Sequence, residues 1–275
     1  MTKKIIFFCI LIINYFNAQQ KQIWYELKYR PSVSVDSTVS VNMVLDINGS
    51  KSIFREQSER RNDSLYQQTK NLLQISNYDF RDGLHLVKNK KNKIYFKLVT
   101  RKSTLFKIEI SEKIIWSILP ETKKIADLNC QKAITNYGGR EWIAWFTTSI
   151  NLQEGPYVFD GLPGLIISIE DKQSDFIFSL QAIKNSNGDL FQINKYIPIT
   201  WQDYKKQKLD YFSDPMRDYN SQFADPGQPV VFFDEFGKKI TPNFKEMNDN
   251  MQKNIIKNNN PIELNQKINY PQKNR

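Results

Sequence analysis

Apolar and polar residues alternate with a period of two through the first half of the sequence, as in strands that bury one face. The stretches 23–29 and 39–47 both alternate in this way. Asn48-Gly49 follows the second stretch and favours a tight hairpin turn, because both residue types tolerate positive φ. A return strand is therefore predicted at 52–56.

More strands of the same kind follow, separated by turn residues. They are predicted at 94–100, 104–110, 124–135, 141–147, 165–170 and 176–182. Residues 57–78 are polar and lose the alternation, which indicates a long loop or short helix and a mobile segment. Sequential hairpins make neighbouring strands antiparallel. The expected fold is a β-rich α+β domain with a strongly curved antiparallel sheet of hairpins and one or two C-terminal helices.

Two helices are predicted late in the chain. Thr200 with Asp203 three residues later resembles a capping box, so one helix is expected at 201–212. For the second helix, Thr241 is the expected N-cap and Pro242 the first helical residue. Its apolar stripe consists of Phe244, Met247, Met251 and Ile255. We expect the stripe to pack on the sheet, and a membrane or a partner groove is the alternative.

The N-terminus has the pattern of a cleavable signal peptide over residues 1–18. Lys3 and Lys4 precede an apolar run at 5–13, which is too short to cross a bilayer, and Ala18 is the expected cleavage position. The protein is therefore expected to be periplasmic or otherwise exported, with no transmembrane segment in the mature chain. We expect a single β-rich domain at 19–257 and a polar, partly disordered tail at 258–275.

The charge is moderately basic. The chain has 39 Lys and Arg against 29 Asp and Glu, a formal net charge of +10. The densest cluster, at Lys88, Lys90, Lys91 and Lys93, is interpreted as a solvated turn, and attraction to anionic lipid or polysaccharide is the functional alternative. Nucleic acid is not expected as a partner of an exported chain.

Cysteine and histidine are scarce. Cys9 lies within the leader, so Cys130 alone is left in the mature chain and no intramolecular disulfide is expected. His85 is the only histidine, which excludes monomeric zinc sites that need two or three imidazoles. Cys130 is interpreted as a small buried hydrophobic residue and His85 as an outward strand position. A thiol–imidazole pair between them is the catalytic alternative.

No nucleophile elbow, phosphate-binding loop, dinucleotide fingerprint or calcium loop occurs in the sequence. Three carboxylates near a predicted hairpin, Asp160, Asp171 and Asp175, are candidates for acid–base chemistry. Turn formation also explains them and is the strongly favoured interpretation. We therefore assign no catalytic, cofactor-binding or metal-binding residue, and we consider an enzyme less well supported than a binding protein.

The segment 130–169 is the most distinctive part of the chain. Gly138-Gly139 is predicted to close a hairpin, and the next strand places Trp142 on one face and Trp145 on the other. Pro163 and Gly164 suit the two central positions of a type II turn.

The string GLPGLI at 161–166 resembles the signature of the GLPGLI family of exported bacterial proteins. The similarity extends to the closing string at 259–264. The residues that carry it are Cys130, Lys132, Gly139, Arg140, Trp142, Trp145, Gly155, Pro156, Gly161, Leu162, Pro163, Gly164, Leu165 and Ile166. The resemblance implies an envelope location and an association with outer-membrane transport systems. It supplies no catalytic residue and no cofactor.

Three functions remain open at this point. The first is a noncatalytic periplasmic binding or accessory protein whose concave sheet and C-terminal helix enclose an apolar ligand or dock a partner. The second is an envelope hydrolase that uses Cys130 or a carboxylate pair. The third is an assembly partner of an outer-membrane transport protein.

Overall fold

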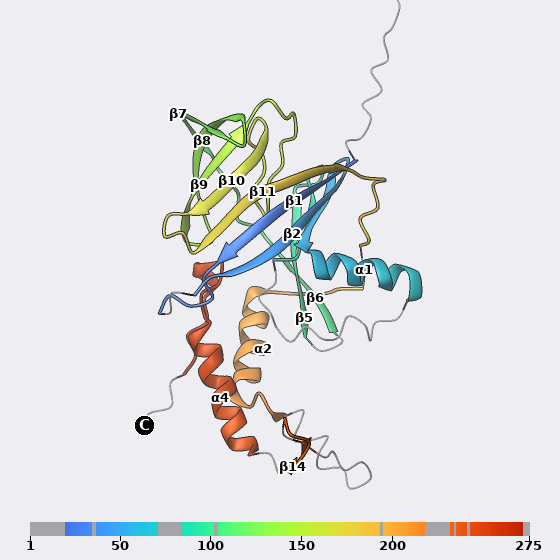
Figure 1. The fold of residues 1–275 in the computed structure, drawn as a ribbon, viewed down its shortest axis with the longest axis vertical. Helices are drawn as coiled ribbons and strands as arrows, with labels where there is room; N and C mark the ends of the chain where they lie inside the picture. The colour runs from blue at the N-terminus through green and yellow to red at the C-terminus, as the bar shows by residue number, and fades with distance from the viewer. Residues whose placement is uncertain are drawn as a thin grey trace, which may run out of the picture.

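The structure is a computed structural model that describes residues 20–34, 37–70, 84–101, 104–192, 195–217, 232–233, 235–240 and 243–271. Twelve of its strands form one open, curved sheet (Figure 1). They are β1 (Gln20–Tyr29), β2 (Val39–Asn48), β3 (Lys51–Glu56), β4 (Leu86–Asn89), β5 (Ile94–Arg101), β6 (Thr104–Glu109), β7 (Ser117–Ile125), β8 (Leu128–Tyr137), β9 (Arg140–Thr147), β10 (Leu165–Asp171), β11 (Phe176–Asn185) and β12 (Ile197–Ile199).

The strand order is β12-β6-β5-β4-β3-β2-β1-β11-β10-β9-β8-β7. Strands β1 to β6 run outward from the centre by successive antiparallel pairings, and β7 to β11 run inward until β11 pairs with β1. Only β12 pairs in parallel, with β6, among these strands. The predicted β-rich α+β class and the curved antiparallel sheet are confirmed.

Two-residue turns set the register of the hairpins. Gly138 and Gly139 connect β8 to β9, and both have positive φ, at 62° and 76°. Asn48 pairs with Lys51, so the turn after β2 consists of Gly49 and the residue after it rather than of Asn48-Gly49.

One predicted strand was wrong. The range 124–135 is not a single strand, because Ala126 and Asp127 take φ of 46° and 64° and reverse the chain between β7 and β8. Asp tolerates such a backbone, but Ala gives no turn signal. The alternation of apolar and polar residues therefore did not predict the hairpin between β7 and β8.

The main core packs on one face of the sheet, and the loop 152–162 contributes apolar side chains to it. Trp142 on β9 is fully buried, and its ring centroid lies 4.6 Å from that of Phe159 in the loop. Ala144 and Phe146 share this face with Trp142, whereas Trp145 is only partly buried on the other face. The predicted orientation of this strand is confirmed.

The helices are α1 (Gln57–Thr69), α2 (Trp201–Ser213) and α4 (Phe244–Lys257), and a short 3₁₀ helix η2 spans Leu264–Gln266. Helix α1 occupies part of the segment expected as a loop or short helix. It packs on β2 and β3, on the face opposite the main core. Helices α2 and α4 lie side by side and project beyond the sheet as an arm (Figure 1).

The start of α2 is as predicted, since the Thr200 side chain accepts from the Asp203 N–H. Helix α4 begins later than predicted, because Asn243 is its N-cap and accepts from the N–H of Glu246 at 3.1 Å. The expected cap Thr241 and first helical residue Pro242 lie outside the described residues. The apolar stripe of α4 is not buried under the sheet as expected, and Met247 is 39% exposed.

Candidate functional site

A cavity of about 710 Å³ lies between the edge of the core at β1 and β2 and the C-terminal part of the chain. Its volume falls within the range of ligand pockets, roughly 300–1,000 Å³. The cavity is lined by Leu27, Tyr29, Pro31, Val39, Val41, Met43, Glu56, Leu84, Phe176, Lys208, Asn254, Ile255, Asn258, Asn259, Asn260, Pro261, Ile262 and Tyr270.

The sheet side of the cavity is apolar. Leu27 on β1 pairs with Val41 on β2, so the alternation of both strands presents their apolar faces together. Leu27 and Met43 are buried, whereas Val41 is only half-buried. Tyr29 stacks on Phe176 with ring centroids 5.9 Å apart and extends this wall. The surface of this wall that remains accessible is at Tyr29, Val39 and Val41, because the other apolar residues of the wall are buried.

The opposite side is formed by Ile255 of α4 and by the segment after it. This segment, Asn258 to Ile262, contributes asparagine amides and the ring of Pro261. The sequence predicted a polar, partly disordered tail from residue 258. It gave no indication that Asn260, Ile262 and Glu263 are buried. We call residues 258–263 the C-terminal wall.

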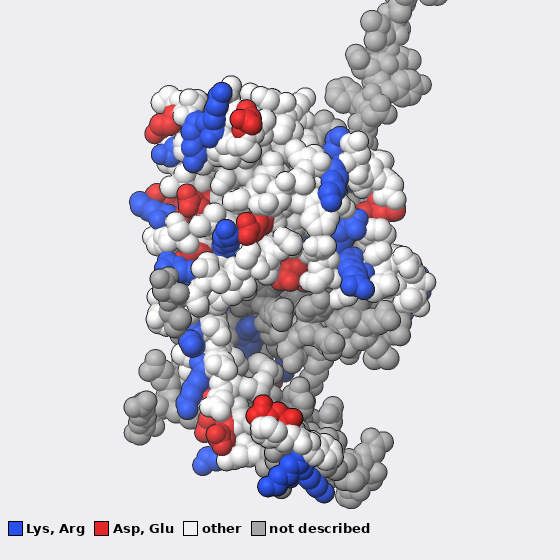
Figure 2. Space-filling view, in the orientation of Figure 1, with Lys and Arg blue, Asp and Glu red and all other residues white. Residues whose placement is uncertain are grey.

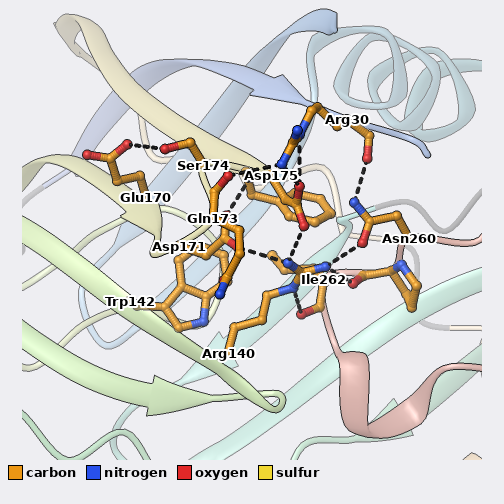
Figure 3. Close-up of polar contacts among 12 residues, drawn as sticks. Arg30, Arg140, Trp142, Glu170, Asp171, Gln173, Ser174, Asp175, Asn260 and Ile262 are labelled. Carbon is orange, nitrogen blue, oxygen red and sulfur yellow. Dashed lines mark hydrogen bonds and ion pairs between the residues drawn. The ribbon is translucent and has the colours of Figure 1, made fainter. Parts of the chain in front are cut away.

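Arg140 holds the C-terminal wall in place (Figure 3). Its Nη2 donates to Asn260 Oδ1 at 2.7 Å and to the carbonyl of Pro261 at 2.8 Å, and its Nε donates to the carbonyl of Ile262 at 3.1 Å. The hairpin turn beside it also contributes, since a Cβ on Gly138 would lie 3.0 Å from the Cα of Glu263. The Arg140 guanidinium therefore fixes the wall through hydrogen bonds, and the absence of a side chain at Gly138 lets the wall approach the turn.

Two aspartates neutralise Arg140. Its Nη1 donates to Asp171 Oδ2 at 2.8 Å and to Asp175 Oδ2 at 2.9 Å. Burial raises the pKa of Asp175, but hydrogen bonds from Arg140 and Arg30 outweigh that effect and leave the pKa below its ordinary value. The candidate carboxylates of this hairpin thus serve a buried ion-pair network, which composition could not distinguish from turn formation.

Glu263 forms a second anchor of the C-terminal wall. Its carboxylate accepts from Lys97 Nζ at 2.8 Å and from Tyr137 Oη at 3.0 Å, and Tyr157 donates to the same carboxylate oxygen as Tyr137. Burial, reinforced by the charge of Glu263, raises the pKa of both tyrosines well above the ordinary value. Both phenols therefore stay protonated and donate.

The loop that carries the GLPGLI string supports the core rather than the cavity. A Cβ on Gly164 would lie 2.0 Å from the carbonyl oxygen of Thr147, so only glycine fits there. The predicted type II turn is not formed, because the Gly164 N–H donates to the carbonyl of Leu162 two residues earlier, at 2.7 Å. The string forms a tight contact between the loop and β9.

A buried ion pair fixes the start of the same loop. Lys88 is fully buried and donates to Glu154 Oε2 at 2.8 Å, while Lys90 Nζ lies 2.6 Å from Glu154 Oε1. The interpretation of Lys88 as part of a solvated turn was therefore wrong, although Lys91 and Lys93 are exposed. Burial raises the pKa of Glu154, but the two lysines lower it by more than burial raises it. The net pKa is below the ordinary value, and the carboxyl stays ionised.

None of the fourteen family-like residues lines the cavity. Arg140 contacts the C-terminal wall, and Gly139 lies close to Asn265 just after that wall. Gly155 to Gly164 lie before β10, and Leu165 and Ile166 begin that strand. Trp145 and Lys132 lie on the other face of the sheet, where Lys123 stacks over the Trp145 ring at 4.1 Å. Sequence reasoning identified the apolar face of β1 and β2 and noted the string at 259–264, but it did not show that these segments line one cavity, because alternation does not tell where an apolar face stays uncovered.

Cys130 lies on β8, whereas His85 immediately precedes β4, and the two residues have different neighbours. Cys130 is buried as predicted, and burial raises the pKa of its thiol. His85 is buried, contrary to the outward position expected, with its nitrogens 3.9 Å from Glu59 Oε1 and from Asp63 Oδ2. The structure gives no support to a thiol–imidazole pair.

His85 belongs to a second buried network, between α1 and β3. Arg55 is fully buried and lies 3.3 Å from Asp63 and 3.2 Å from Asp46. Burial, with the charge of neighbouring Glu56, raises the pKa of Glu59 to about 8. Burial, only partly offset by Arg55, raises the pKa of Asp63 to about 7, and burial together with Arg55 lowers the pKa of His85 well below its ordinary value.

Among the described residues, no group of three or more His, Cys, Asp or Glu side chains is arranged to hold a metal ion. No helix in the same residues has the length and apolar character needed to cross a membrane.

No protein-family model matches the sequence, and no curated protein matches it either. Among solved structures, the chain is similar to PNGF-II in two crystal forms, P21 and C2. The sequence identity is 17% and 16%, and the TM-score is 0.48 in both cases. The matches cover 69% of this chain but only 33% and 32% of the PNGF-II chain, so this chain corresponds to about a third of that protein. A similarity of this degree carries no argument about function.

Proposed function

We propose that this protein is an exported, noncatalytic binding protein that holds an elongated apolar molecule, such as an acyl chain, in the cavity between β1, β2 and the C-terminal wall. The observation that carries the proposal is the cavity itself. It has about 710 Å³ of space against a mainly apolar wall, and most polar lining residues, apart from Glu56 of β3, lie on the opposite side. Ligand sites typically combine a mainly apolar lining with few polar groups in this way.

The distribution of polar groups favours an amphiphilic ligand. The apolar chain would lie along Tyr29, Val39 and Val41, which are not fully buried, and each methylene that it buries would contribute about 0.8 kcal/mol. A polar head group would face the amides of Asn254 and Asn258, which both donate and accept hydrogen bonds. A site of this composition offers binding and orientation, and Glu56 and Lys208 place one charge of each sign in its lining.

The location and the partner rest on the sequence. The signal-peptide pattern at 1–18 and the resemblance to the GLPGLI family support an envelope protein that works beside an outer-membrane transport system. Detection of a mature N-terminus after residue 18 by mass spectrometry of the exported protein would test the location. An unprocessed chain that stays in the cytoplasm would contradict it.

Ligand binding can be tested by filling the cavity. Val41→Trp adds a large side chain at a half-buried position of the apolar wall, so displacement of a fluorescent fatty acid should show at least about tenfold weaker binding. The matched control is Ile118→Trp on β7, which is 47% exposed and remote from the lining residues. Native mass spectrometry of the purified protein gives a second measurement. Absence of bound lipid, or equal binding by both variants, would contradict the proposal.

A further inference from the structure

The cavity and the buried network around Arg55 lie on the two sides of the same strands. Met43 on β2 pairs with Glu56 on β3, and both residues line the cavity. Arg55, one residue before Glu56, lies on the opposite face of β3, where α1 packs (Figure 1). In the next segment Leu84 lines the cavity, whereas the adjacent His85 belongs to the network. Only the strands themselves separate the cavity from the network.

Glu56 takes part on both sides. It lines the cavity, and its backbone N–H donates to Glu59 Oε2 at 3.0 Å. The two residues form a capping box, which fixes the position at which α1 begins. Any change that releases Glu59 would therefore also release the cavity wall at Glu56.

Three carboxyl groups lie along one face of α1. Glu56, Glu59 and Asp63 are spaced by three and four residues, and side chains at these spacings are neighbours on a helix. Arg55 Nε lies 3.3 Å from Asp63, but Nε and Nη1 of Arg55 have no hydrogen-bond partner among the described residues. A single buried arginine therefore faces this row of acids from β3.

The other groups around the row do not supply the missing positive charge. Arg60 and Arg55 both contact Asp46 of β2, at 2.9 and 3.2 Å, so that carboxylate takes part of their charge. His85 stays neutral, because burial and the charge of Arg55 lower its pKa. Tyr196, just before β12, is neutral as well, since burial and the neighbouring acids of α1 raise its pKa. Carboxyl groups are therefore in excess over cations in this network.

The acids behind the cavity wall titrate where exposed acids do not. Burial raises the pKa of Glu59 to about 8 and, although Arg55 opposes the effect, that of Asp63 to about 7. On the face shown in Figure 2, by contrast, Asp and Glu side chains lie among Lys and Arg at the surface. A carboxyl group in water titrates near pH 4. Between pH 6.5 and 8.5 the row on α1 therefore gains charge while ordinary surface acids do not change.

We propose that ionisation of Glu59 and Asp63 opens the cavity wall at Glu56, so that the cavity holds an apolar ligand at neutral pH and releases it in alkaline solution. This inference rests on the proposed function, because it concerns the affinity of the same cavity. Like charges four residues apart destabilise a helix, and the charge of Glu56 adds to their repulsion. The first turn of α1 then separates from β3, and Glu56 loses the bond that fixes it in the wall. Ligand and protons thus stabilise the same conformation.

Probe binding to the full mature chain at two pH values tests the coupling. The probe is N-phenyl-1-naphthylamine, a fluorescent apolar molecule that stays uncharged from pH 6.5 to 8.5. At pH 8.5 a carboxyl with a pKa of about 8 keeps its proton in roughly a quarter of the molecules, so the dissociation constant should rise at least about fourfold from pH 6.5.

Amide variants assign the effect to the row on α1. Glu59→Gln combined with Asp63→Asn removes both titrating groups and keeps side-chain oxygens that accept hydrogen bonds, so probe binding should become equal at the two pH values. The matched control is Glu141→Gln combined with Glu170→Gln, two carboxyls on neighbouring strands away from the cavity lining, and it should keep the full change. Circular dichroism at pH 6.5 confirms that each variant is folded.

Hydrogen exchange gives a measurement that needs no ligand. After correction for the intrinsic effect of pH, the amides of 56–63 should exchange faster at pH 8.5 than at pH 6.5 in the unchanged protein but not in the Glu59, Asp63 variant. If the probe binds at neither pH, the proposed function is wrong and the coupling fails with it. If the probe binds equally well at both pH values, or if the Glu59, Asp63 variant keeps the fourfold change, the cavity stands as a ligand site and only the coupling is overturned.

Discussion

Two buried arginine networks lie on opposite faces of the same sheet, and the pKa values of their carboxyl groups are shifted in opposite directions. Around Arg140, the pKa of Asp175 is lowered, whereas around Arg55 the pKa values of Glu59 and Asp63 are raised to about 8 and about 7. Burial acts in the same direction in both networks. The two networks also differ in how completely their charges are paired, and we infer that this pairing contributes to the difference in pKa.

In the Arg140 network the pairing is complete. Arg30 and Arg140 face Asp171 and Asp175, and the three guanidinium nitrogens of Arg140 all donate to oxygen acceptors. In the Arg55 network carboxylates are in excess, and among the described residues Nη1 of Arg55 has no hydrogen-bond partner. A saturated network keeps its charges, and an unsaturated one takes up protons instead.

The largest expected effect comes from breaking the saturated network. Arg140→Met should lower the free energy of unfolding by about 3–5 kcal/mol, because it leaves Asp171 buried without its cation and Asp175 with Arg30 alone. The same variant should lose ligand binding at the cavity, since the C-terminal wall loses its anchor. Urea denaturation, with fatty-acid displacement on the folded fraction, measures both effects.

The control is a surface ion pair on the same hairpin. Lys172 and Glu141 are paired at 3.1 Å, with their side chains 61% and 41% exposed. Lys172→Met should change stability by less than about 1 kcal/mol. Comparable losses in the two variants would show that burial of the Arg140 network has no special weight.

The second prediction concerns pH and the unsaturated network. A carboxyl whose folded pKa is raised binds more protons in the folded state, so its contribution to stability is lost as pH rises through that pKa. His85 has a lowered pKa and opposes this trend only below its unfolded value of about 6.5. Between pH 6.5 and 8 the carboxyls act alone, and the free energy of unfolding should fall by about 2 kcal/mol.

Single variants locate the source of this slope. Glu59→Gln should remove more than half of the fall between pH 6.5 and 8, because the Gln side chain does not titrate. Asp175, whose pKa is lowered, contributes no slope in this window, since its stabilisation is lost only near and below its unfolded pKa of about 3.9. A stability that is flat from pH 6.5 to 8 in the unchanged protein would mean that Glu59 and Asp63 are ionised throughout.

The sequence predicted most strands of the sheet but not the buried ion-pair networks. Period-two alternation identified β2 and β9 and the inward side of each, because burial of one face constrains every second residue. It could not distinguish Lys88, which is fully buried against Glu154, from its exposed neighbours Lys91 and Lys93. A buried charge depends on a partner far away in the chain, and alternation within one strand contains no information about that partner.

The cavity shows the same limit. Val41 and Met43 were placed on an apolar face, but whether such a face is covered depends on where residues more than 200 positions later are held. The closing string at 259–264 was noted only as part of a resemblance. Its role as the C-terminal wall follows from contacts between Arg140 and Asn260 that no local pattern encodes.

The smallest predicted effect tests whether saturation itself sets the behaviour of the Arg140 network. Asn260 accepts from Arg140 Nη2 at 2.7 Å and donates to the carbonyl of Arg30 at 2.8 Å, and it also helps to keep the pKa of Asp175 low. Asn260→Ala should lower the free energy of unfolding by about 1–2 kcal/mol, because Arg140 Nη2 keeps its bond to Pro261. The pKa of Asp175, followed by carboxyl carbon NMR, should rise, which is the direction of the shifts in the Arg55 network.

Asn265→Ala, at an exposed position that bonds Glu112, is the control and should leave the pKa of Asp175 unchanged. An unchanged Asp175 pKa in the Asn260 variant would mean that the arginines alone hold the carboxylate ionised, and that the contrast between the two networks reflects charge balance rather than hydrogen-bond saturation.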